Sequence, residues 1–287
     1  MESIVSYPNR GPWGKSSWRG NTTGHLLVDL FRHFKPRRVV DPAEGSGTTR
    51  DVCRDLQTPY EGFDLHSGFN LLTDSLARAC TCAPDMVFFH PPYGDMITYS
   101  GNVWGKPTEG DLSRCKDQED FIDKLQLALI NIYDALERDG HYAVLIGDHR
   151  KKGEFRSYQS DVIQMGIGSL RNVVIKTQHN CVSDRRQYAG SFIPIRHEYL
   201  LIFRKDNGLF AIGPLATQRL SKAFYGTWRN LVEFTLRKLG GKASLSELYR
   251  FVGTPEGHEN SHVQAKIRQV VQKHFVRVER GVYALAS

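Results

Sequence analysis

The first two hundred residues alternate between short apolar runs and longer stretches whose apolar residues recur at helical spacing. Runs that predict buried strands occupy residues 38–41, 60–64, 85–89 and 141–146, and helices are predicted at 24–34, 49–56, 120–136 and 158–170. Residues 173–176 and 198–204 predict two more strands, joined as a hairpin. Strands that alternate with helices build a parallel sheet, and its binding sites lie at the carboxyl ends of the strands. We therefore expect an α/β fold, a doubly wound sheet with a final antiparallel hairpin strand.

The pattern changes after residue 207. Residues 208–221 include Gly213-Pro214 and predict a linker between a first domain, residues 1–207, and a second, residues 222–287. The second domain has helical patterns at 224–239, from Ser244 onward and at 263–274, and then two alternating runs within 275–285. Three helices followed by a hairpin are typical of a winged helix-turn-helix.

The basic excess of the chain is confined to its last quarter. The formal net charge is +7, and residues 214–287 contain 12 Lys and Arg against 5 Asp and Glu, whereas the rest is balanced. Such a segment is expected to contact a polyanion, and the alternatives are a solvated basic surface or a protein-interaction module. Candidate nucleic-acid contacts in this segment are Lys266, Arg268, Gln269, Lys273, Arg277 and Arg280.

A glycine-rich turn follows the first predicted strand. Residues 41–49, Asp-Pro-Ala-Glu-Gly-Ser-Gly-Thr-Thr, lead into a helix, and the two glycines allow the backbone to approach a ligand closely. Asp64 ends the next predicted strand, where a carboxylate can accept hydrogen bonds from both hydroxyl groups of a ribose. The turn lacks the Gly-Lys-Ser/Thr ending of a phosphate loop and contains Glu44. We predict a nucleoside cofactor without phosphates, and the alternative is a plain strand-to-helix turn.

The run His90-Pro91-Pro92-Tyr93 follows the strand predicted at 85–89. Proline fixes φ and lacks an N–H, so carbonyl groups here can accept hydrogen bonds without a competing amide. Tyr93 offers an aromatic face on which a planar base can stack. We therefore predict that these four residues form the catalytic turn for a base with an amino group. The alternative is a proline-rich turn with a packed tyrosine.

Together the two motifs resemble those of the S-adenosylmethionine-dependent amino-methyltransferases that act on DNA, which modify adenine N6 or cytosine N4. The resemblance covers about residues 10–205 and implies a Rossmann-like methyltransferase sheet with S-adenosyl-L-methionine as cofactor. It implies that Asp41, Gly45 and Gly47 line the methionine end of the cofactor, within a turn that also contains Pro42 and Thr48. It further places Asp64 at the ribose, Asp74 at the adenine, and Trp13, Arg19 and Asn21 in a second cofactor-side motif.

One position departs from that family. His90 stands where the family has Asp, Asn or Ser, which accept a hydrogen bond from the target amino group. A neutral imidazole can accept the same bond and an imidazolium cannot, so we expect activity to fall below about pH 6.5. The departure also removes the usual cue between adenine and cytosine. Adenine N6 is favoured, and the absence of a cysteine beside the prolines argues against cytosine C5.

The sequence thus predicts a site-specific DNA methyltransferase that acts on duplex DNA with an everted base. The alternatives are an RNA amino-methyltransferase and a catalytically inactive DNA-binding subunit, and a homodimer or a restriction-system partner is possible. Tyr99 and Trp104 lie in a polar loop that either covers the everted base, binds the neighbouring strand or is an ordinary surface loop. Candidate phosphate contacts are Arg150, Lys151, Lys152, Arg185 and Arg186.

Composition excludes several other classes. No apolar run approaches the roughly 20 residues that span a bilayer, and the first residues do not resemble a secretory signal. The five cysteines include a Cys-x-Cys at 80–82 but no second pair at zinc spacing. We expect a cytoplasmic protein with no membrane segment, no disulfide scaffold and no metal.

Overall fold

The computed structural model describes residues 1–179, 191–206, 232–233, 235–236, 239–252 and 263–285. The chain divides into two compact units, Met1–Asp206 and Asn207–Ser287. The predicted linker at 208–221 lies outside the described residues.

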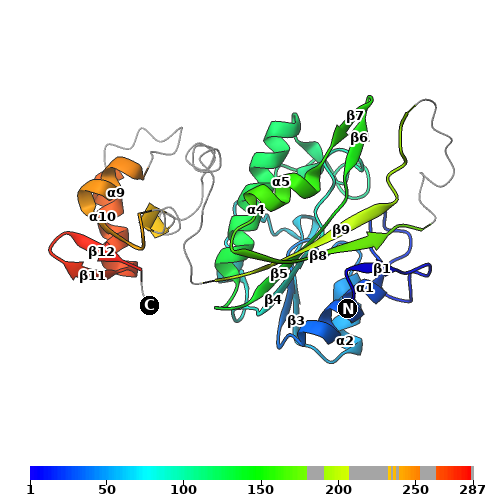
Figure 1. Ribbon diagram of the computed structural model, residues 1–287, viewed down its shortest axis with the longest axis horizontal. Helices are drawn as coiled ribbons and strands as arrows, with labels where there is room; N and C mark the ends of the chain where they lie inside the picture. Colours follow the sequence, from blue (N-terminus) through cyan, green and yellow to red (C-terminus); the bar gives the residue numbers. More distant parts are fainter. Residues whose placement is uncertain (180–190, 207–231, 234, 237–238, 253–262, 286–287) are drawn as a thin grey trace. The chain divides into compact units, whose positions relative to one another are not determined.

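A seven-stranded sheet forms the centre of the first unit (Figure 1). Its strands are β1 (Ile4–Ser6), β2 (Val39–Asp41), β3 (Tyr60–Gly62), β4 (Met86–Phe89), β5 (His141–Ile146), β8 (Ser169–Thr177) and β9 (His197–Arg204). They lie in the order β1-β8-β9-β5-β4-β2-β3. Strand β9 is antiparallel to β5 and β8, and all other neighbours are parallel. The predicted α/β sheet with an antiparallel hairpin strand is confirmed.

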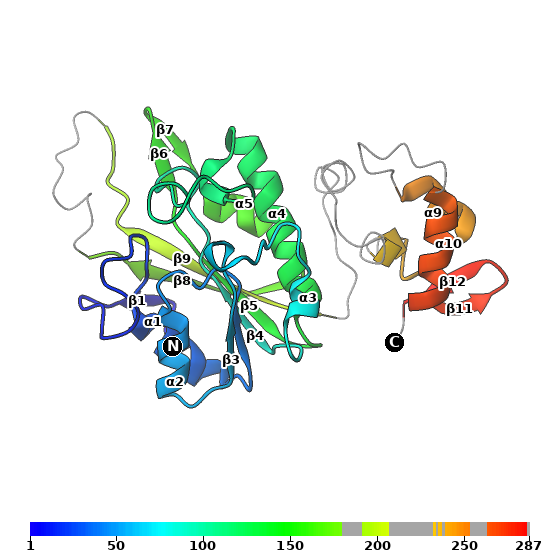
Figure 2. The same ribbon diagram turned by 180° about the vertical axis from the view of Figure 1, so that it is seen from behind.

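Helices cover both faces of this sheet (Figures 1 and 2). They are α1 (Gly24–Phe34), α2 (Thr48–Asp55), α3 (Leu76–Ala79), α4 (Gln118–Ala135) and α5 (Tyr158–Met165). On one face, Leu27 and Phe31 of α1 pack with Phe88 and Leu145 in the main core. The next residues along each strand point to the other face, where the rings of Tyr142 and Phe203 stack 4.8 Å apart. Helices α4 and α5 contact each other on this second face.

Helix α1 has the bounds that the sequence predicts, because both of its ends are capped. The Thr23 side chain accepts a hydrogen bond from the His25 N–H at the N-terminus. Lys35 adopts a left-handed conformation (φ 52°) at the C-terminus, and Pro36 follows. The caps keep α1 short, so that residues 37–41 return directly into β2.

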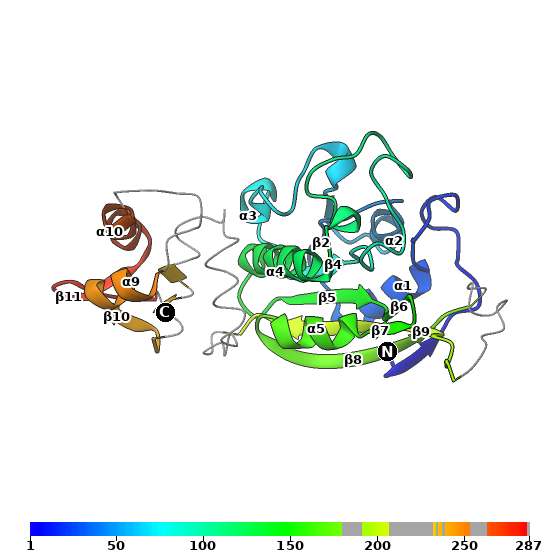
Figure 3. The same cartoon turned by 90° about the horizontal axis from the view of Figure 1, so that it is seen from above.

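Several features differ from the sequence-based expectation, including α3, which no predicted element covers. Helix α5 ends at Met165 and not at residue 170, because Gly166 and Gly168 (φ 93°) end it and β8 begins at Ser169. Strand β1 lies at the edge of the sheet beside the end of β8 (Figure 3). Residues 149–156 form a hairpin of β6 (His149–Lys151) and β7 (Glu154–Arg156). The residues of β1 and of the β6–β7 hairpin show no strong period-2 alternation of apolar and polar side chains, so the sequence does not predict these strands.

The second unit contains a three-stranded sheet and two described helices. Its elements are β10 (Lys242–Ser244), α9 (Leu245–Phe251), α10 (Val263–His274), β11 (Val276–Glu279) and β12 (Val282–Ala284), with a sheet order of β10-β12-β11. Ser244 and Glu247 form the predicted capping box of α9. Most of the helix predicted at 224–239 lies outside the described residues, and the winged helix-turn-helix stays a prediction.

In the part of the chain described here, no helix combines the length and the hydropathy that crossing a membrane requires. The same residues bring no three His, Cys, Asp or Glu side chains together as a metal site.

Candidate functional site

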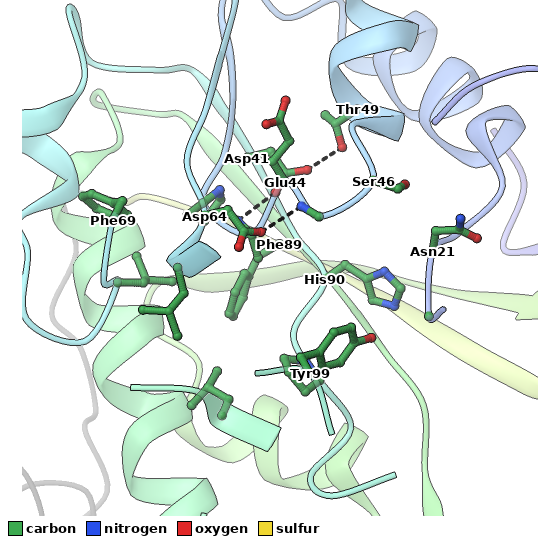
Figure 4. Close-up of a pocket in the computed structure, with 18 of the residues that line it drawn as sticks. Asn21, Asp41, Glu44, Ser46, Thr49, Asp64, Phe69, Phe89, His90 and Tyr99 are labelled. Atoms are coloured by element: carbon green, nitrogen blue, oxygen red, sulfur yellow. Dashed lines mark hydrogen bonds between the residues drawn. The ribbon is translucent and has the colours of Figure 1, made fainter. Parts of the chain in front are cut away.

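The turns after β2 and β4 open onto one cavity at the carboxyl ends of the parallel strands (Figure 4). The two strands are neighbours in the sheet, which brings residues 41–46 and 88–90 to the same cavity although the sequence separates them by more than 40 positions. Among the predicted site residues, the cavity lining includes Asn21, Asp41, Pro42, Gly45, Thr48, Asp64, His90 and Pro92.

Two glycines with positive φ shape the first turn. Gly45 (φ 50°) lies against Trp18, and a Cβ there would come within 3.2 Å of the Trp18 Nε1. Gly47 (φ 79°) is the N-cap of α2 and donates its N–H to the Glu44 carbonyl over 3.0 Å. Gly45 lines the cavity, whereas Gly47 shapes the turn from outside the lining.

Asp41 is a buried carboxylate beneath this turn. It is 3% exposed, and it accepts hydrogen bonds from the Ala43 N–H at 3.0 Å and the Thr49 hydroxyl at 2.5 Å (Figure 4). Burial raises the pKa of Asp41 to about 7, although these two hydrogen bonds oppose the shift. A cation in the cavity would therefore favour the ionised form of Asp41.

Asp64 connects the end of β3 with the glycine turn. Its Oδ2 accepts the Gly45 N–H at 2.8 Å, and its Oδ1 accepts the His66 N–H at 3.0 Å. The His66 Nδ1 lies 2.5 Å from the same Oδ1. One carboxylate thus fixes the distance between two segments of the cavity wall and still faces the cavity.

The remaining wall combines an apolar surface with the buried hydroxyl group of Thr22. The apolar lining residues include Leu65, Phe69, Leu71, Leu72, Phe89 and Leu112. Thr22 also lines the cavity, and its Oγ1 is buried and has no hydrogen-bond partner among the residues that the structure describes. A buried hydroxyl group without a partner costs free energy, and a ligand atom in the cavity can satisfy it.

His90 lies at the end of β4 on the cavity wall, and Figure 4 shows its ring between Asn21 and Tyr99 in that view. Burial lowers the pKa of His90 to about 4, although the negative charge of Glu198 opposes the shift. The expectation that protonation begins near pH 6.5 is therefore wrong for the folded protein, because that value belongs to a solvated histidine.

We expect the loss of activity that depends on His90, measured as the difference between wild type and His90→Asn, to occur near pH 4, where His90 gains a proton. The pKa of Asp41, about 7, affects both proteins alike. Between about pH 6.5 and 4 the unfolded chain binds that proton and the folded chain does not, so folding stability falls as the pH falls. Relative to His90→Asn, the wild type should lose up to about 3 kcal/mol over this window. Urea unfolding and initial rates at each pH measure the two effects. An acid limb centred near pH 6.5 would contradict the assignment.

Tyr93 does not line the cavity. Its hydroxyl group donates to Glu198 Oε1 over 3.0 Å and lies 2.9 Å from His90 Nε2. Its ring lies against Gly147, where a Cβ would come within 2.8 Å of the Tyr93 Cε2. Pro91 is also absent from the lining. The stacking surface expected from Tyr93 is thus turned toward β5 and β9 in this structure.

The loop after Tyr93 contributes two aromatic side chains to the cavity lining, Tyr99 and Trp104. Their loop is held by Asp111, which accepts hydrogen bonds from the Ser100 N–H at 2.7 Å and from the Ser100 hydroxyl at 2.5 Å. Ser113 then accepts the Tyr99 N–H over 2.9 Å. Of the three interpretations of this loop, the structure places it at the cavity, where a base could stack.

Three other predicted cofactor contacts lie outside the cavity lining, Trp13, Arg19 and Asp74. The Trp13 Nε1 donates to Asp55 of α2 over 2.7 Å, so this ring supports the helix. Asp74 is exposed, and its carboxylate accepts the Asn70 N–H over 2.8 Å. Asp74 therefore orders the segment that contributes residues 69–72 to the cavity and does not itself face it.

Three of the predicted phosphate contacts of the first unit, Arg150, Lys151 and Lys152, lie on the β6–β7 hairpin. The Arg150 guanidinium donates to the Ile193 carbonyl at 3.0 Å, Lys151 is ion-paired with Asp95, and Lys152 is exposed. Arg185 and Arg186 lie outside the described residues. Among Arg150, Lys151 and Lys152, the charge of Lys152 is therefore the most exposed to a partner.

In the second unit all six predicted contacts are exposed, on α10 and at the β11–β12 hairpin: Lys266, Arg268, Gln269, Lys273, Arg277 and Arg280. Ile267, Val270 and Val271 are buried on the opposite face of α10. This separation leaves the basic face of α10 open to a partner.

A scan against protein-family models finds no match to the chain, and a search of the curated proteins finds none either. Among solved structures, the chain is similar to TrmN from Thermus thermophilus, with 16% identity, a TM-score of 0.40, and coverage of 65% of this chain and 50% of that chain. It is similar to a SAM dependent methyltransferase from Archaeoglobus fulgidus, with 12% identity, a TM-score of 0.38, and coverage of 65% and 96%. A proposed DNA modification methylase from Thermus thermophilus, complexed with S-adenosyl-L-methionine, has 20% identity, a TM-score of 0.29, and coverage of 55% and 55%. The chain therefore spans about half the length of the first and third of these proteins.

Proposed function

We propose that the protein is an S-adenosylmethionine-dependent DNA methyltransferase that acts on an exocyclic base amino group, with adenine N6 favoured over cytosine N4. One observation carries the proposal: the glycine turn with Asp64 and the His90-Pro91-Pro92 turn open onto the same cavity. A cofactor bound at the first turn and a base at the second would share that space.

The residues of the cavity fit this cofactor. Asp64 would hold the ribose hydroxyl groups, and the apolar wall at Phe69 and Leu71 suits a flat adenine ring. Asp41 offers a buried negative charge to a cationic methionine tail. The free hydroxyl group of Thr22 gives the site a further polar contact. When bound, S-adenosylmethionine supplies a methyl group on a positively charged sulfur.

His90 performs the protein's part of the chemistry. As a neutral imidazole it accepts a hydrogen bond from the target amino group, which orients the nitrogen lone pair away from the histidine. The methylated nitrogen must then release one proton, and the acceptor nitrogen of His90 can take it. Tyr99 and Trp104 offer rings for stacking the everted base, and the basic face of α10 would contact the DNA backbone as part of a winged helix.

Transfer of labelled methyl groups tests the proposal. Wild type and His90→Ala are each incubated with labelled cofactor and with duplex DNA, single-stranded DNA or RNA, and the product bases are then identified. We expect the wild type to transfer label to the adenine N6 of duplex DNA, and we expect His90→Ala to transfer almost none. Label on RNA alone, or cofactor binding without transfer to any nucleic acid, would contradict it in favour of an RNA enzyme or an inactive subunit.

We expect Thr22→Val to weaken cofactor binding about 5-fold while the unfolding free energy stays equal or rises by about 1 kcal/mol, because valine removes a buried hydroxyl without a partner. Thr23→Val is the matched control. It removes the N-cap of α1 and should cost about 1 kcal/mol of stability with little change in affinity. Calorimetric titration and urea unfolding measure both quantities. Equal affinity of Thr22→Val and wild type would exclude the contact.

A further inference from the structure

A chain of polar side chains connects the cavity with the strand pair β8–β9. The His90 Nε2 and the Tyr93 hydroxyl oxygen are 2.9 Å apart, and the Tyr93 hydroxyl group donates to Glu198 Oε1 over 3.0 Å. Glu198 on β9 stands directly opposite Lys176 on β8 in the antiparallel register. The Lys176 Nζ donates to Glu198 Oε2 over 2.8 Å, and each of these two side chains is only 10% exposed.

Such a buried ion pair is costly, because both groups lose their hydration. Glu198 is surrounded by donors, since Gln178 Nε2 also donates to its Oε1 over 2.7 Å. Burial alone would raise the pKa of Glu198, but Lys176, His90 and Gln178 lower it below its usual range. Glu198 is therefore an ionised carboxylate, which can only accept hydrogen bonds.

The ionised state of Glu198 fixes the direction of the hydrogen bonds that link Glu198, Tyr93 and His90. The single proton of the Tyr93 hydroxyl group points to Glu198, so the Tyr93 oxygen must accept from His90. The proton of neutral His90 therefore resides on Nε2. Among the described residues, His90 Nδ1 has no hydrogen-bond partner, and it is the ring nitrogen that keeps its lone pair.

We propose that Glu198, paired with Lys176, sets the tautomer and orientation of His90 through Tyr93, so that His90 presents Nδ1 as the acceptor to the target amino group. Glu198, Lys176 and Tyr93 are positioning residues in this scheme. The tautomer follows from these hydrogen bonds together with the ionised state of Glu198 and the neutral state of His90. Only the use of Nδ1 by the target rests on the proposed function.

The substitution Glu198→Gln keeps the size of the side chain and should reverse the direction of the hydrogen bonds between residue 198, Tyr93 and His90. Lys176 can only donate, so it holds the amide oxygen on its own side and turns the amide nitrogen toward Tyr93. The Gln178 amide, which donates to this position in the wild type, would turn over and offer its oxygen to the new amide nitrogen. That nitrogen would also donate to the Tyr93 oxygen, and Tyr93 would donate to His90 Nε2. The proton of His90 then moves to Nδ1, and the acceptor at the cavity becomes a donor.

Long-range ¹⁵N–¹H correlation spectra of the full chain, with ¹⁵N-labelled histidine, measure this directly at neutral pH without any substrate. We expect a protonated Nε2 in the wild type, a protonated Nδ1 in Glu198→Gln, and no single fixed form in Tyr93→Phe. Glu61→Gln is the control, because Glu61 is also ion-paired, with Arg38 at 3.2 Å, but does not line the cavity. It should leave the His90 spectrum unchanged. A protonated Nδ1 in the wild type overturns the proposal, even if Glu198→Gln fails to fold.

Kinetics separate this proposal from the function itself. Glu198→Gln should lower kcat on the order of 10²-fold with little change in cofactor affinity, because the wrong tautomer faces the target. Adding Tyr93→Phe to His90→Asn should have little further effect, since asparagine has no tautomer to fix. If the spectra respond as expected and no nucleic acid is methylated, the proposed function fails and the tautomer assignment stands. If methylation occurs and Glu198→Gln changes neither the spectrum nor kcat, the positioning role is wrong.

Discussion

His90→Ala is expected to lower kcat for methyl transfer on the order of 10²-fold while the dissociation constant of S-adenosylmethionine changes less than about 3-fold. The substitution removes the acceptor that orients the target amino group. It leaves in place Asp64, Thr22 and the glycine turn, which are the proposed contacts of the cofactor in the cavity lining. Single-turnover rates and equilibrium titration of the cofactor measure the two quantities separately.

Two variants give this prediction its control. His90→Asn restores an acceptor oxygen of the kind that the DNA amino-methyltransferases use and should recover part of kcat. His33→Ala removes an exposed histidine of α1 that does not line the cavity and should leave kcat unchanged. An equal loss in His90→Ala and His90→Asn would mean that His90 acts through packing and not as an acceptor.

Asp64→Ala is expected to raise the dissociation constant of the cofactor by about 10- to 100-fold, because a hydrogen bond to a charged group contributes about 1.5–3 kcal/mol. Part of the loss comes from the predicted ribose contact. The rest comes from the Gly45 N–H, which loses its acceptor at 2.8 Å and no longer holds the glycine turn in place. Fluorescence or calorimetric titration of the cofactor measures the change.

Asp74→Ala is the matched test. Asp74 is also acidic, but it is exposed and outside the cavity lining, and its carboxylate accepts the Asn70 N–H. The dissociation constant should therefore change less than about 3-fold. Comparable losses in both variants would contradict the placement of Asp74 outside the cavity. Asp64→Asn, which keeps one acceptor oxygen, should lie between wild type and Asp64→Ala.

The glycine turn, Asp64 and His90 could be predicted because their signals are local. Each stands directly after an apolar strand pattern, and parallel neighbouring strands bring their carboxyl ends to one edge of the sheet. The alternation of strands and helices is enough to predict that shared edge.

The orientation of Tyr93 could not be predicted in this way. It depends on Glu198, which is 105 positions away in the sequence and reaches Tyr93 because β9 is inserted antiparallel beside β5. Thr22 and Phe69 lie in segments without a strand or helix pattern, so no periodicity marks them as cavity residues. Asp74 was expected at the adenine by resemblance, and the backbone turn at Asn70 directs its carboxylate elsewhere.

The pairing of β1 with β8 has a consequence for how the chain is made. Ile4 pairs with Ile175, and Val5 with Lys176, so the edge strand meets its partner across about 170 positions of sequence. During synthesis residues 4–6 leave the ribosome long before residues 175–177, and contacts at such separation form slowly. Lys176 belongs both to this pairing and to the ion pair with Glu198. We therefore expect β1 to pair with β8 late in folding, at the same time as the Lys176–Glu198 ion pair that completes the hydrogen bonds to Tyr93 and His90.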